Sequence, residues 1–285
     1  MPCSMSETFD SVLSRLIAAQ IPSPRLETRL LLAEVLQLAE NQPLPFAAEI
    51  NPEQRRRLED MLALRLQHYP LCKILGHKGF YKYEFTVNEN VLSPRPDTEI
   101  LVEAAISLSK QKKLRTMVDF GTGSGCILLS VLGDVPEMAG TGVDISAAAL
   151  EVAVCNAQNL GLSDRAAFIN ADWFDEGFVG GLGQKFDLMV SNPPYIPSTD
   201  IAGLDEEVRA HDPLLALDGG KDGLRDYRRL AEIAPLILKP GAYVLLEAGI
   251  GQALDIASVF EDKGFVLEHI RNDLNSIPRC VILHN

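Results

Sequence analysis

The sequence predicts an α/β protein in which a doubly wound, mainly parallel sheet follows a small helical bundle. From residue 115 onward, apolar segments of strand length alternate with segments of helical periodicity, as in a parallel sheet with right-handed crossovers. Before residue 76 the apolar residues recur at helical spacing, and between residues 81 and 87 they recur at every second position. We therefore expect three parts: a helical bundle at 1–75, a β-hairpin linker at 76–96 and the α/β domain at 97–285.

The N-terminal bundle is expected to contain three helices, at residues 6–20, 24–40 and 51–67. In the first, Phe9 and Val12 share an apolar face, and Ser6 is the expected N-cap. The third opens with Asn51 as a cap and Pro52 at the first helical position, where the N–H that proline lacks would be unpaired anyway. Three amphipathic helices of this length can bury a small core of their own.

The linker is expected to be a β-hairpin. Tyr81, Tyr83 and Phe85 alternate with polar residues, which predicts a half-buried strand. The following segment, "VNENVLSPRP", is expected to turn and return as the second strand of the hairpin.

The α/β domain is expected to open with a helix at 97–110. Seven strands are expected at 116–120, 139–144, 166–170, 186–191, 242–248, 265–271 and 279–284. Helices are expected at 125–132, 146–160, 224–237 and 251–263. The last two strands have no helix between them, so the seventh strand is expected to be antiparallel.

The charge balance argues against binding to extended nucleic acid. The chain of 285 residues has a net charge of −13, and residues 77–285 carry 18 basic and 30 acidic side chains. A body with this excess of negative charge is repelled by phosphate backbones.

Cysteine and histidine usage indicates a cytoplasmic protein without a metal site. The five cysteines are scattered and form no CxxC pair, and the five histidines show no HxxxH or HxH spacing. The N-terminal segment has neither the basic start nor the apolar core of a secretory signal, and no apolar run reaches the roughly 18 residues of a membrane helix.

A glycine-rich loop after the first strand of the domain predicts a nucleoside-containing cofactor. "VDFGTGSGCILLS" reads as a strand, a turn with Gly121, Gly123 and Gly125, and a helix start whose free N–H groups can face a ligand. Asp144 ends the next strand, 23 residues beyond Gly121, a separation at which an acidic side chain typically binds a ribose diol. Because Cys126 stands where a dinucleotide fingerprint has glycine, the loop alone does not identify the cofactor, and a purely structural turn is the alternative.

Two further sites near this loop, Asp119 and the segment Asp172-Trp173, each allow two interpretations. Asp119, at the tip of the strand, could cap the following turn or accept a hydrogen bond from an ammonium group of the ligand. Asp172 and Trp173 in "NADWFD" would flank an adenine, although the single tryptophan of the chain could equally be a core residue.

The stretch "SNPPYI" ends the fourth strand with two prolines, which cannot continue a sheet ladder. Proline after Asn192 favours an extended backbone there, and Pro193 and Pro194 hold their carbonyls with little freedom to lose. The Asn192 side-chain oxygen and the Pro193 carbonyl then form a fixed pair of acceptors, which suits a planar NH2 group. Tyr195 could stack on that group or close the pocket. A turn that merely ends the strand is the alternative.

Some of these motifs resemble a large enzyme family, and others resemble one branch of it. "DFGTGSGCI", "GVDIS", "ADWF" and "SNPPYI" resemble the class I S-adenosylmethionine-dependent methyltransferases, which implies a Rossmann-like seven-stranded sheet. "PRPDTE" combined with "NPPYI" resembles the HemK/PrmC branch, the peptide chain release factor N5-glutamine methyltransferases, from about residue 25 to the end. The chain departs from that pattern at Asp212, where glutamate is usual, and at Ala242, where glycine is usual.

The resemblance implies a reaction and a set of site residues. The reaction is methyl transfer from S-adenosylmethionine to the glutamine of the GGQ motif in class-1 release factors. The residues implied to bind S-adenosylmethionine are Gly121, Thr122, Gly123, Ser124, Gly125, Asp144, Trp173 and Asn192. Those implied to hold the substrate glutamine are Asn192, Pro193, Pro194 and Tyr195, with catalysis assigned to Asn192, Pro193 and Tyr195. The alternatives are methylation of a ribosomal-protein glutamine or of an exocyclic amine of a nucleobase.

Overall fold

The computed structural model describes residues 4–39, 42–46 and 49–285, which form two compact units. The first, here called the helical unit, comprises Met1–Gly76 together with the short segment Glu206–His211. The second, the sheet unit, comprises His77–Asp205 and Asp212–Asn285. One of the five cysteines, Cys3, lies outside the described residues.

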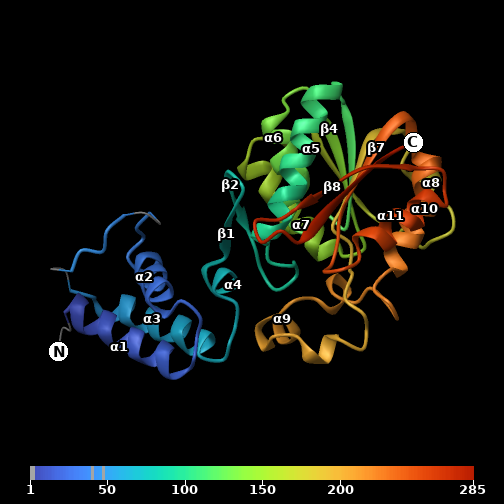
Figure 1. Ribbon diagram of the computed structural model, residues 1–285. Helices are drawn as coiled ribbons and strands as arrows, with labels where there is room; N and C mark the ends of the chain where they lie inside the picture. The colour runs from blue at the N-terminus through green and yellow to red at the C-terminus, as the bar shows by residue number, and fades with distance from the viewer. Residues whose placement is uncertain (1–3, 40–41, 47–48) are drawn as a thin grey trace. The chain divides into compact units, whose positions relative to one another are not determined.

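The helical unit packs amphipathic helices around a core of its own. Its N-terminal helices are α1 (Met5–Ala18), α2 (Pro24–Val35), α3 (Pro52–Arg65) and α4 (Leu71–Leu75), drawn in blue to cyan in Figure 1. The apolar side chains that the sequence places on one face of each long helix meet in this core. The three expected helices are therefore confirmed, but α2 ends at Val35, so the expected helix over residues 36–39 was wrong, and residue 40 lies outside the described residues.

The start of α1 differs from the expectation. Its N-cap is Ser4, and the expectation of Ser6 was wrong. The Ser4 hydroxyl accepts a hydrogen bond from the Glu7 N–H, and the Glu7 carboxylate accepts one from the Ser4 N–H at 3.0 Å. This reciprocal pair needs an acidic or amide side chain three residues after the cap, which Ser6 does not have. At α3 the expected cap Asn51 and first-turn Pro52 are both confirmed.

A buried arginine joins a distant segment to the helical unit. The side chain of Arg65 is 2% exposed and forms ion pairs with Glu27 (2.6 Å) and with Glu207 (2.9 Å). Glu207 lies on α9 (Glu206–His211), and the Lys73 ammonium donates to the His211 carbonyl at 2.7 Å. Because a buried charge is costly unless it is paired, these contacts hold α9 against α3 and α4.

The hairpin of the linker is present, with its turn earlier than expected. Strands β1 (His77–Phe80) and β2 (Tyr83–Thr86) pair antiparallel, and Tyr81 takes a φ of 57° in the turn between them. The expected return strand over 87–96 was wrong, because that segment is irregular. The alternating pattern belongs to the second strand of the hairpin, whose partner is the less regular stretch that precedes it.

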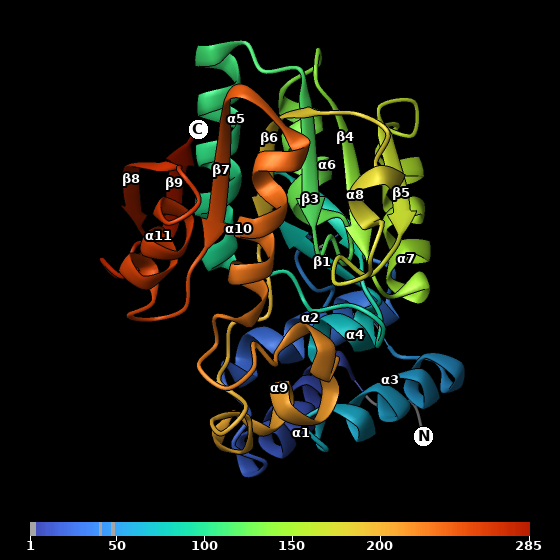
Figure 2. The same cartoon turned by 90° about the vertical axis from the view of Figure 1, so that its right-hand side faces the viewer.

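The sheet unit contains a seven-stranded sheet in the order β5-β4-β3-β6-β7-β9-β8, which can be followed across Figure 2. Its strands are β3 (Thr116–Phe120), β4 (Ala139–Asp144), β5 (Ala166–Asn170), β6 (Phe186–Ser191), β7 (Leu238–Glu247), β8 (Val266–Asn272) and β9 (Pro278–His284). The first five run parallel, and β9 is antiparallel to both β7 and β8. The predicted parallel sheet with an antiparallel seventh strand is confirmed.

Helices cover both faces of this sheet, as Figure 1 shows. One face carries α5 (Glu99–Lys112), α6 (Cys126–Asp134) and α7 (Ala147–Asn159); the other carries α8 (Phe178–Gly181), α10 (Arg225–Ile237) and α11 (Ala253–Glu261). A separate apolar core fills each of the two layers. Strands β3 and β6 and most of β7 are buried on both faces, which explains their nearly continuous apolar segments, whereas the edge strands β5 and β8 are partly exposed.

The strand order decides where a ligand can bind. From β3 the chain proceeds outward to β4 and β5, and then returns to β6 on the other side of β3. Loops that leave β3 and β6 therefore diverge at the carboxyl ends of the strands, where open α/β sheets bind their ligands. None of the described helices combines the length and the hydrophobicity that a membrane-spanning helix requires.

Candidate active site

The glycine loop after β3 turns sharply into α6. Gly121, Gly123 and Gly125 have φ values of 70°, 54° and 78°, a region that residues with a Cβ rarely adopt. A Cβ on Gly121 would lie 3.6 Å from the Trp173 ring, so the ring packs directly over the loop. The sharp turn from β3 into α6 therefore requires glycine at these three positions.

Asp144, at the carboxyl end of β4, is tied to this loop. Its Oδ2 accepts from the Gly123 N–H and its Oδ1 from the Ser146 N–H, both at 2.9 Å. Burial raises the pKa of Asp144 even though the hydrogen bonds from Ser146 and Gly123 favour the ionised form. Each carboxylate oxygen has a second lone pair, so the group can still accept from a ligand hydroxyl.

Asp119 lies beneath the loop and is completely buried. Its Oδ2 accepts from the Thr122 hydroxyl at 2.7 Å, while Oδ1 has no hydrogen-bond partner within the described part of the chain. Burial raises the pKa of Asp119 to about 7, against the opposing effect of the Thr122 hydroxyl. Oδ2 thus holds the turn, as the first interpretation expects, while Oδ1 lacks a partner among the described residues and Asp119 lines neither of the cavities described below.

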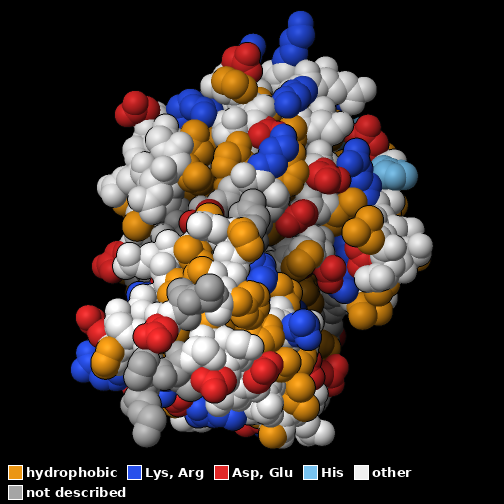
Figure 3. Space-filling view, turned by 90° about the vertical axis from the view of Figure 1, so that its left-hand side faces the viewer, with side chains coloured by type: hydrophobic (Ala, Val, Ile, Leu, Met, Phe, Trp, Pro, Cys, Tyr) orange, Lys and Arg blue, Asp and Glu red, His pale blue; other side chains and the backbone are white. Residues whose placement is uncertain are grey.

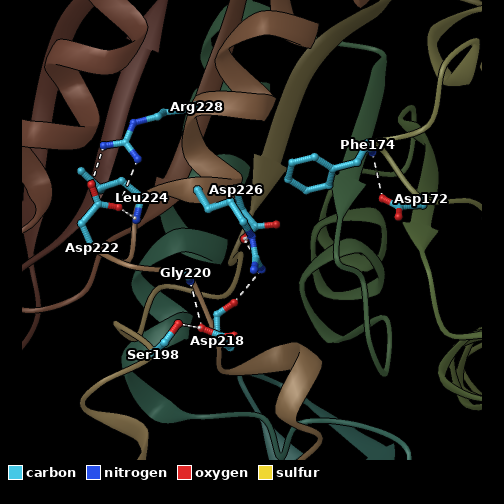
Figure 4. Close-up of polar contacts among 10 residues, drawn as sticks. Asp172, Phe174, Ser198, Asp218, Gly220, Asp222, Leu224, Asp226 and Arg228 are labelled. Carbon is cyan, nitrogen blue, oxygen red and sulfur yellow. Dashed lines mark hydrogen bonds and ion pairs between the residues drawn. The ribbon is translucent and has the colours of Figure 1, made fainter.

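Trp173 is a core residue that also borders the candidate site. It is 7% exposed and belongs to the apolar core, with its ring edge-on to Phe120 at 5.9 Å between centroids. It also lines the cavities described below. Its backbone carbonyl accepts from Arg229 Nε at 2.8 Å, and the neighbouring Asp172 accepts from the Phe174 N–H at 2.8 Å (Figure 4). These contacts fix the segment that follows β5.

Asn192-Pro193-Pro194-Tyr195 leaves the carboxyl end of β6, directly beside the glycine loop on β3. Asn192 is half-buried, and its Nδ2 donates to the Thr98 hydroxyl at 3.3 Å. This assignment directs Oδ1 away from Thr98. The Tyr195 carbonyl accepts from Gln252 Nε2 at 3.0 Å, and burial raises the pKa of the Tyr195 phenol.

A second glycine-rich loop, "LDGGKDG", supports this segment from behind. Ile196 donates to Leu217 and accepts from Gly219, so the two stretches are pinned together directly after Tyr195. A Cβ on Gly219 would lie 2.7 Å from the Pro194 carbonyl oxygen, which no side chain permits. Figure 4 shows how Asp218 accepts from Ser198 and Gly220, while Asp222 accepts from Leu224 and Arg228.

Two adjoining cavities open at these loops, both within the sheet unit. One, of about 140 Å³, is lined by residues of the glycine loop, Asp144, Trp173 and Asn192. The other, of about 330 Å³, is lined by Trp173 and by Phe174, Pro194 and Asp226 among others. They share Ile145, Trp173, Pro194 and Leu215. The site thus has room for a ligand beside the loop and for a second group beside the prolines.

The structure brings most of the sequence-predicted site residues to one place. Gly121, Gly123, Asp144, Trp173, Asn192 and Pro194 line the smaller cavity. The side chains of Thr122 and Ser124 are buried and do not line it, so these two residues can offer a ligand only backbone groups.

Sequence reasoning missed Thr98 and Gln252, which hold Asn192 and Tyr195. Thr98 stands inside the quoted motif "PRPDTE", which was the available signal; nothing in the local sequence marked Gln252.

Comparisons with known proteins identify the family of the chain. The model of the PrmC N-terminal domain matches residues 7–76, and the model of the methyltransferase small domain matches residues 93–205. A release factor glutamine methyltransferase of Rhodospirillum rubrum is 43% identical, covering 94% of this chain and 81% of that protein. One of Caulobacter vibrioides is 39% identical over 99% of this chain and 96% of its own length. The chain belongs to the release factor glutamine methyltransferases.

The chain is also similar to a longer protein and to a solved methyltransferase structure. A bifunctional methyltransferase of Rickettsia conorii is 33% identical, and the match spans 99% of this chain but 58% of that longer protein. A solved methyltransferase structure complexed with SAH has a TM-score of 0.52 at 11% identity and covers 71% of this chain and 53% of its own, which supports the fold.

The protein is thus a methyltransferase with the class I fold, and S-adenosylmethionine is its methyl donor. The site fits that cofactor on structural grounds. Asp144, which has unused lone pairs, lines the smaller cavity together with Gly121 and Gly123. Asp119 Oδ1 is a buried acceptor beneath the glycine loop with no partner among the described residues, although Asp119 itself lines neither cavity. An ammonium group, a ribose diol and a flat ring would find matching partners there.

Proposed function

We propose that this methyltransferase modifies the glutamine of the GGQ motif in class-1 peptide chain release factors, giving N5-methylglutamine. The observation that carries the proposal is the Asn192-Pro193-Pro194-Tyr195 segment at the end of β6. Its Asn192 Nδ2 is engaged by Thr98, so Oδ1 is left as an acceptor beside the cofactor cavity. The names of the two relatives that match over most of their length support the substrate.

The proposed chemistry relies on alignment and polarisation. An amide NH2 is a poor nucleophile because its lone pair is delocalised into the carbonyl. Asn192 Oδ1 and the Pro193 carbonyl would each accept one of its hydrogens, which favours the pyramidal nitrogen of the transition state. S-adenosylmethionine supplies an electrophilic methyl group when bound. No strong base is needed, because an alkylated amide nitrogen loses its extra proton readily to water.

We assign cofactor binding to three groups of contacts. The backbone of Gly121-Thr122-Gly123-Ser124-Gly125 would face the methionine part, Asp144 would accept from the ribose hydroxyls, and Trp173 would border the adenine. Asn192 would contribute from the side of the reacting methyl group. Asp119 Oδ1 is the proposed acceptor for the ammonium group.

This role of Asp119 predicts a pH-dependent affinity. Asp119 has a pKa of about 7 in the free protein, and a bound ammonium group would stabilise its ionised form. Protonation therefore competes with binding, so affinity should fall by up to about tenfold per pH unit as pH decreases below 7. Calorimetric titration between about pH 5.5 and 7.5 checks this; within that range a ligand α-amino group stays protonated.

The control for that experiment is Asp119→Asn. The variant should bind S-adenosylmethionine more weakly and with a flatter pH profile, since the titrating group is gone. An equally steep profile in the variant would assign the pH dependence to another group, such as Asp144.

The helical unit is proposed to dock the release factor. It has its own core, and residues 1–76 carry 8 basic and 9 acidic side chains, in contrast to the acidic remainder. Ile17, Leu26 and Phe46 remain exposed on it. The cavity-lining residues all belong to the sheet unit, so docking and methyl transfer are assigned to different parts of the chain.

Deletion of residues 1–75 tests this division. Cofactor affinity should remain largely intact, whereas methylation of the whole release factor should fall far more than methylation of a short GGQ peptide. The matched control is Glu207→Gln, which removes the ion pair between α9 and Arg65 but keeps every helix. Equal losses on both substrates after the deletion, measured as initial rates of labelled methyl transfer, would contradict a docking role.

The function itself is tested by a methylation assay with labelled S-adenosylmethionine. A class-1 release factor should accept label, and the same factor with its GGQ glutamine replaced by asparagine should not. A ribosomal protein mixture, DNA and RNA are the competing substrates. Preferential labelling of any of these would replace the proposed substrate, and we expect no stable nucleic-acid binding.

The cytoplasm is the proposed compartment. Cys72, Cys126, Cys155 and Cys280 are free thiols in the structure, which agrees with a reducing environment.

A further inference from the structure

The orientation of the Asn192 amide depends on a residue that can hydrogen-bond in either direction. Asn192 Nδ2 lies 3.3 Å from the hydroxyl of Thr98, which closes the short 3₁₀ helix Pro96–Thr98 before α5. A hydroxyl can donate or accept, so this contact alone would permit both orientations of the amide. Only the orientation with Nδ2 on Thr98 leaves Oδ1 for the substrate. Whatever takes the Thr98 proton therefore decides which way Asn192 faces.

Glu247 is placed to take that proton. Glu247 ends β7, the strand next to β6. The last pair in the register of these two parallel strands is Ser191 with Leu246, so Asn192 and Glu247 are the next residue on each side. The side chain of Glu247 is 1% exposed, and its Oε2 has no hydrogen-bond partner in the portion of the chain that the structure describes. Burial raises the pKa of this carboxylate to about 7, and the nearby Thr98 hydroxyl acts in the opposite direction.

Two arginines favour the ionised form of Glu247 against the opposing effects of burial and of Asp97. Arg95 and Arg279 both lower its pKa, and Arg279 also donates to the neighbouring Ala248 carbonyl at 3.3 Å. An ionised carboxylate only accepts hydrogen bonds. If Thr98 donates to this carboxylate, its own oxygen is left to accept from Asn192.

We propose that Glu247 and Thr98 are positioning residues that fix the Asn192 amide with its oxygen toward the substrate glutamine. Neither residue touches the reacting atoms; both act through Asn192. The inference rests on the proposed role of Asn192 as an acceptor for the glutamine NH2. It explains why a carboxylate is buried at the end of β7, where an apolar residue would pack without the cost of desolvation. It also gives a function to the threonine of "PRPDTE".

A double-mutant cycle tests the proposal in the full-length protein at about pH 8.5, above the pKa of about 7 for Glu247. Thr98→Val keeps the shape of the side chain and removes the hydroxyl. It should lower kcat about tenfold at saturating S-adenosylmethionine, with cofactor affinity unchanged, and Thr98→Ser should restore kcat to within about threefold of wild type. In an Asn192→Ala background, Thr98→Val should lower kcat less than about twofold further.

Glu247→Gln is the second variant, and Thr141→Val is the matched control. Glutamine keeps the volume of the side chain but can donate to Thr98, which permits the wrong orientation of the Asn192 amide. Glu247→Gln should therefore lower kcat in the wild-type background but not in the Asn192→Ala background. Thr141 is a buried threonine on β4 outside both cavities, and its valine variant should keep wild-type kcat. Melting temperatures establish that each variant is folded.

The outcomes separate this inference from the function on which it rests. If Asn192→Ala lowers kcat but Thr98→Val and Glu247→Gln do not, the positioning role is overturned and the acceptor role of Asn192 stands. The positioning role is also overturned if Thr98→Val and Glu247→Gln lower kcat by the same factor in the Asn192→Ala background as in the wild type. Thr98 and Glu247 would then act independently of Asn192. If Asn192→Ala itself keeps kcat, the acceptor role fails first.

Discussion

Replacing Asn192 with alanine should lower the single-turnover rate of methyl transfer about 100-fold or more, or roughly 3 kcal/mol. The substitution removes one of the two acceptors proposed for the hydrogens of the reacting nitrogen, and its effect should resemble the loss of one donor from an oxyanion hole. Cofactor affinity should fall much less, because the glycine loop and Asp144 are unchanged. The measurement is labelled methyl transfer to release factor at saturating S-adenosylmethionine.

A matched control for this variant is Asn159→Ala. Asn159 is an exposed asparagine that ends α7 and lines neither cavity, so its loss should leave the rate unchanged. Tyr195→Phe should be mild if the ring stacks on a flat group and severe only if the hydroxyl contacts substrate. An Asn192→Ala rate within about threefold of wild type would mean that the two prolines merely end β6.

Replacing Asp144 with alanine should weaken S-adenosylmethionine binding by about 2–3 kcal/mol, which corresponds to a roughly 30- to 150-fold higher Kd. Two losses combine in this variant. The ribose hydroxyls lose a charged acceptor, and the N–H groups of Gly123 and Ser146 lose the partner that holds the loop. Isothermal titration calorimetry on the purified variant measures the change.

Asp187→Ala separates these effects from a general loss of stability. The Asp187 carboxylate also accepts from two backbone N–H groups, those of Arg115 and Thr116, but it lies at the opposite end of β6 and β3. This control should lower the melting temperature without changing cofactor affinity. Unchanged affinity in a folded Asp144→Ala variant would remove Asp144 from the cofactor site.

The element types and most of their order could be predicted from the sequence, because local signals determine them. All seven strands of the sheet lie where the apolar segments predict them, and the glycine loop adopts the positive φ values that its composition indicates. The hairpin shows the limit of such signals. Its period of two identifies β2, whereas β1 has no such pattern and is defined by pairing with β2.

Part of the site could be predicted for the same reason. Glycine, proline and the residues beside them restrict the backbone locally, so the glycine loop and the Asn192 segment are visible in the sequence. Parallel strands place their carboxyl ends at one edge, and Asp144 and Trp173 could therefore be assigned to the same region.

Other features were decided only by the tertiary structure. Apolar periodicity shows that a strand is buried but not which strand lies beside it, so the insertion of β9 between β7 and β8 left no mark in the sequence. The attachment of α9 to the helical unit likewise depends on Arg65 and Glu207, which are 142 residues apart.

The sequence by itself determined that the chain forms an α/β sheet with a glycine-rich turn after β3 and a proline-ended β6, because short-range sterics and burial suffice for those features. Only the tertiary structure placed Thr98 on Asn192, across 94 residues, and Glu247 on the adjacent strand. Hydrogen bonds between side chains depend on direction as well as proximity, and direction is fixed only when the strands and helices that carry them have packed.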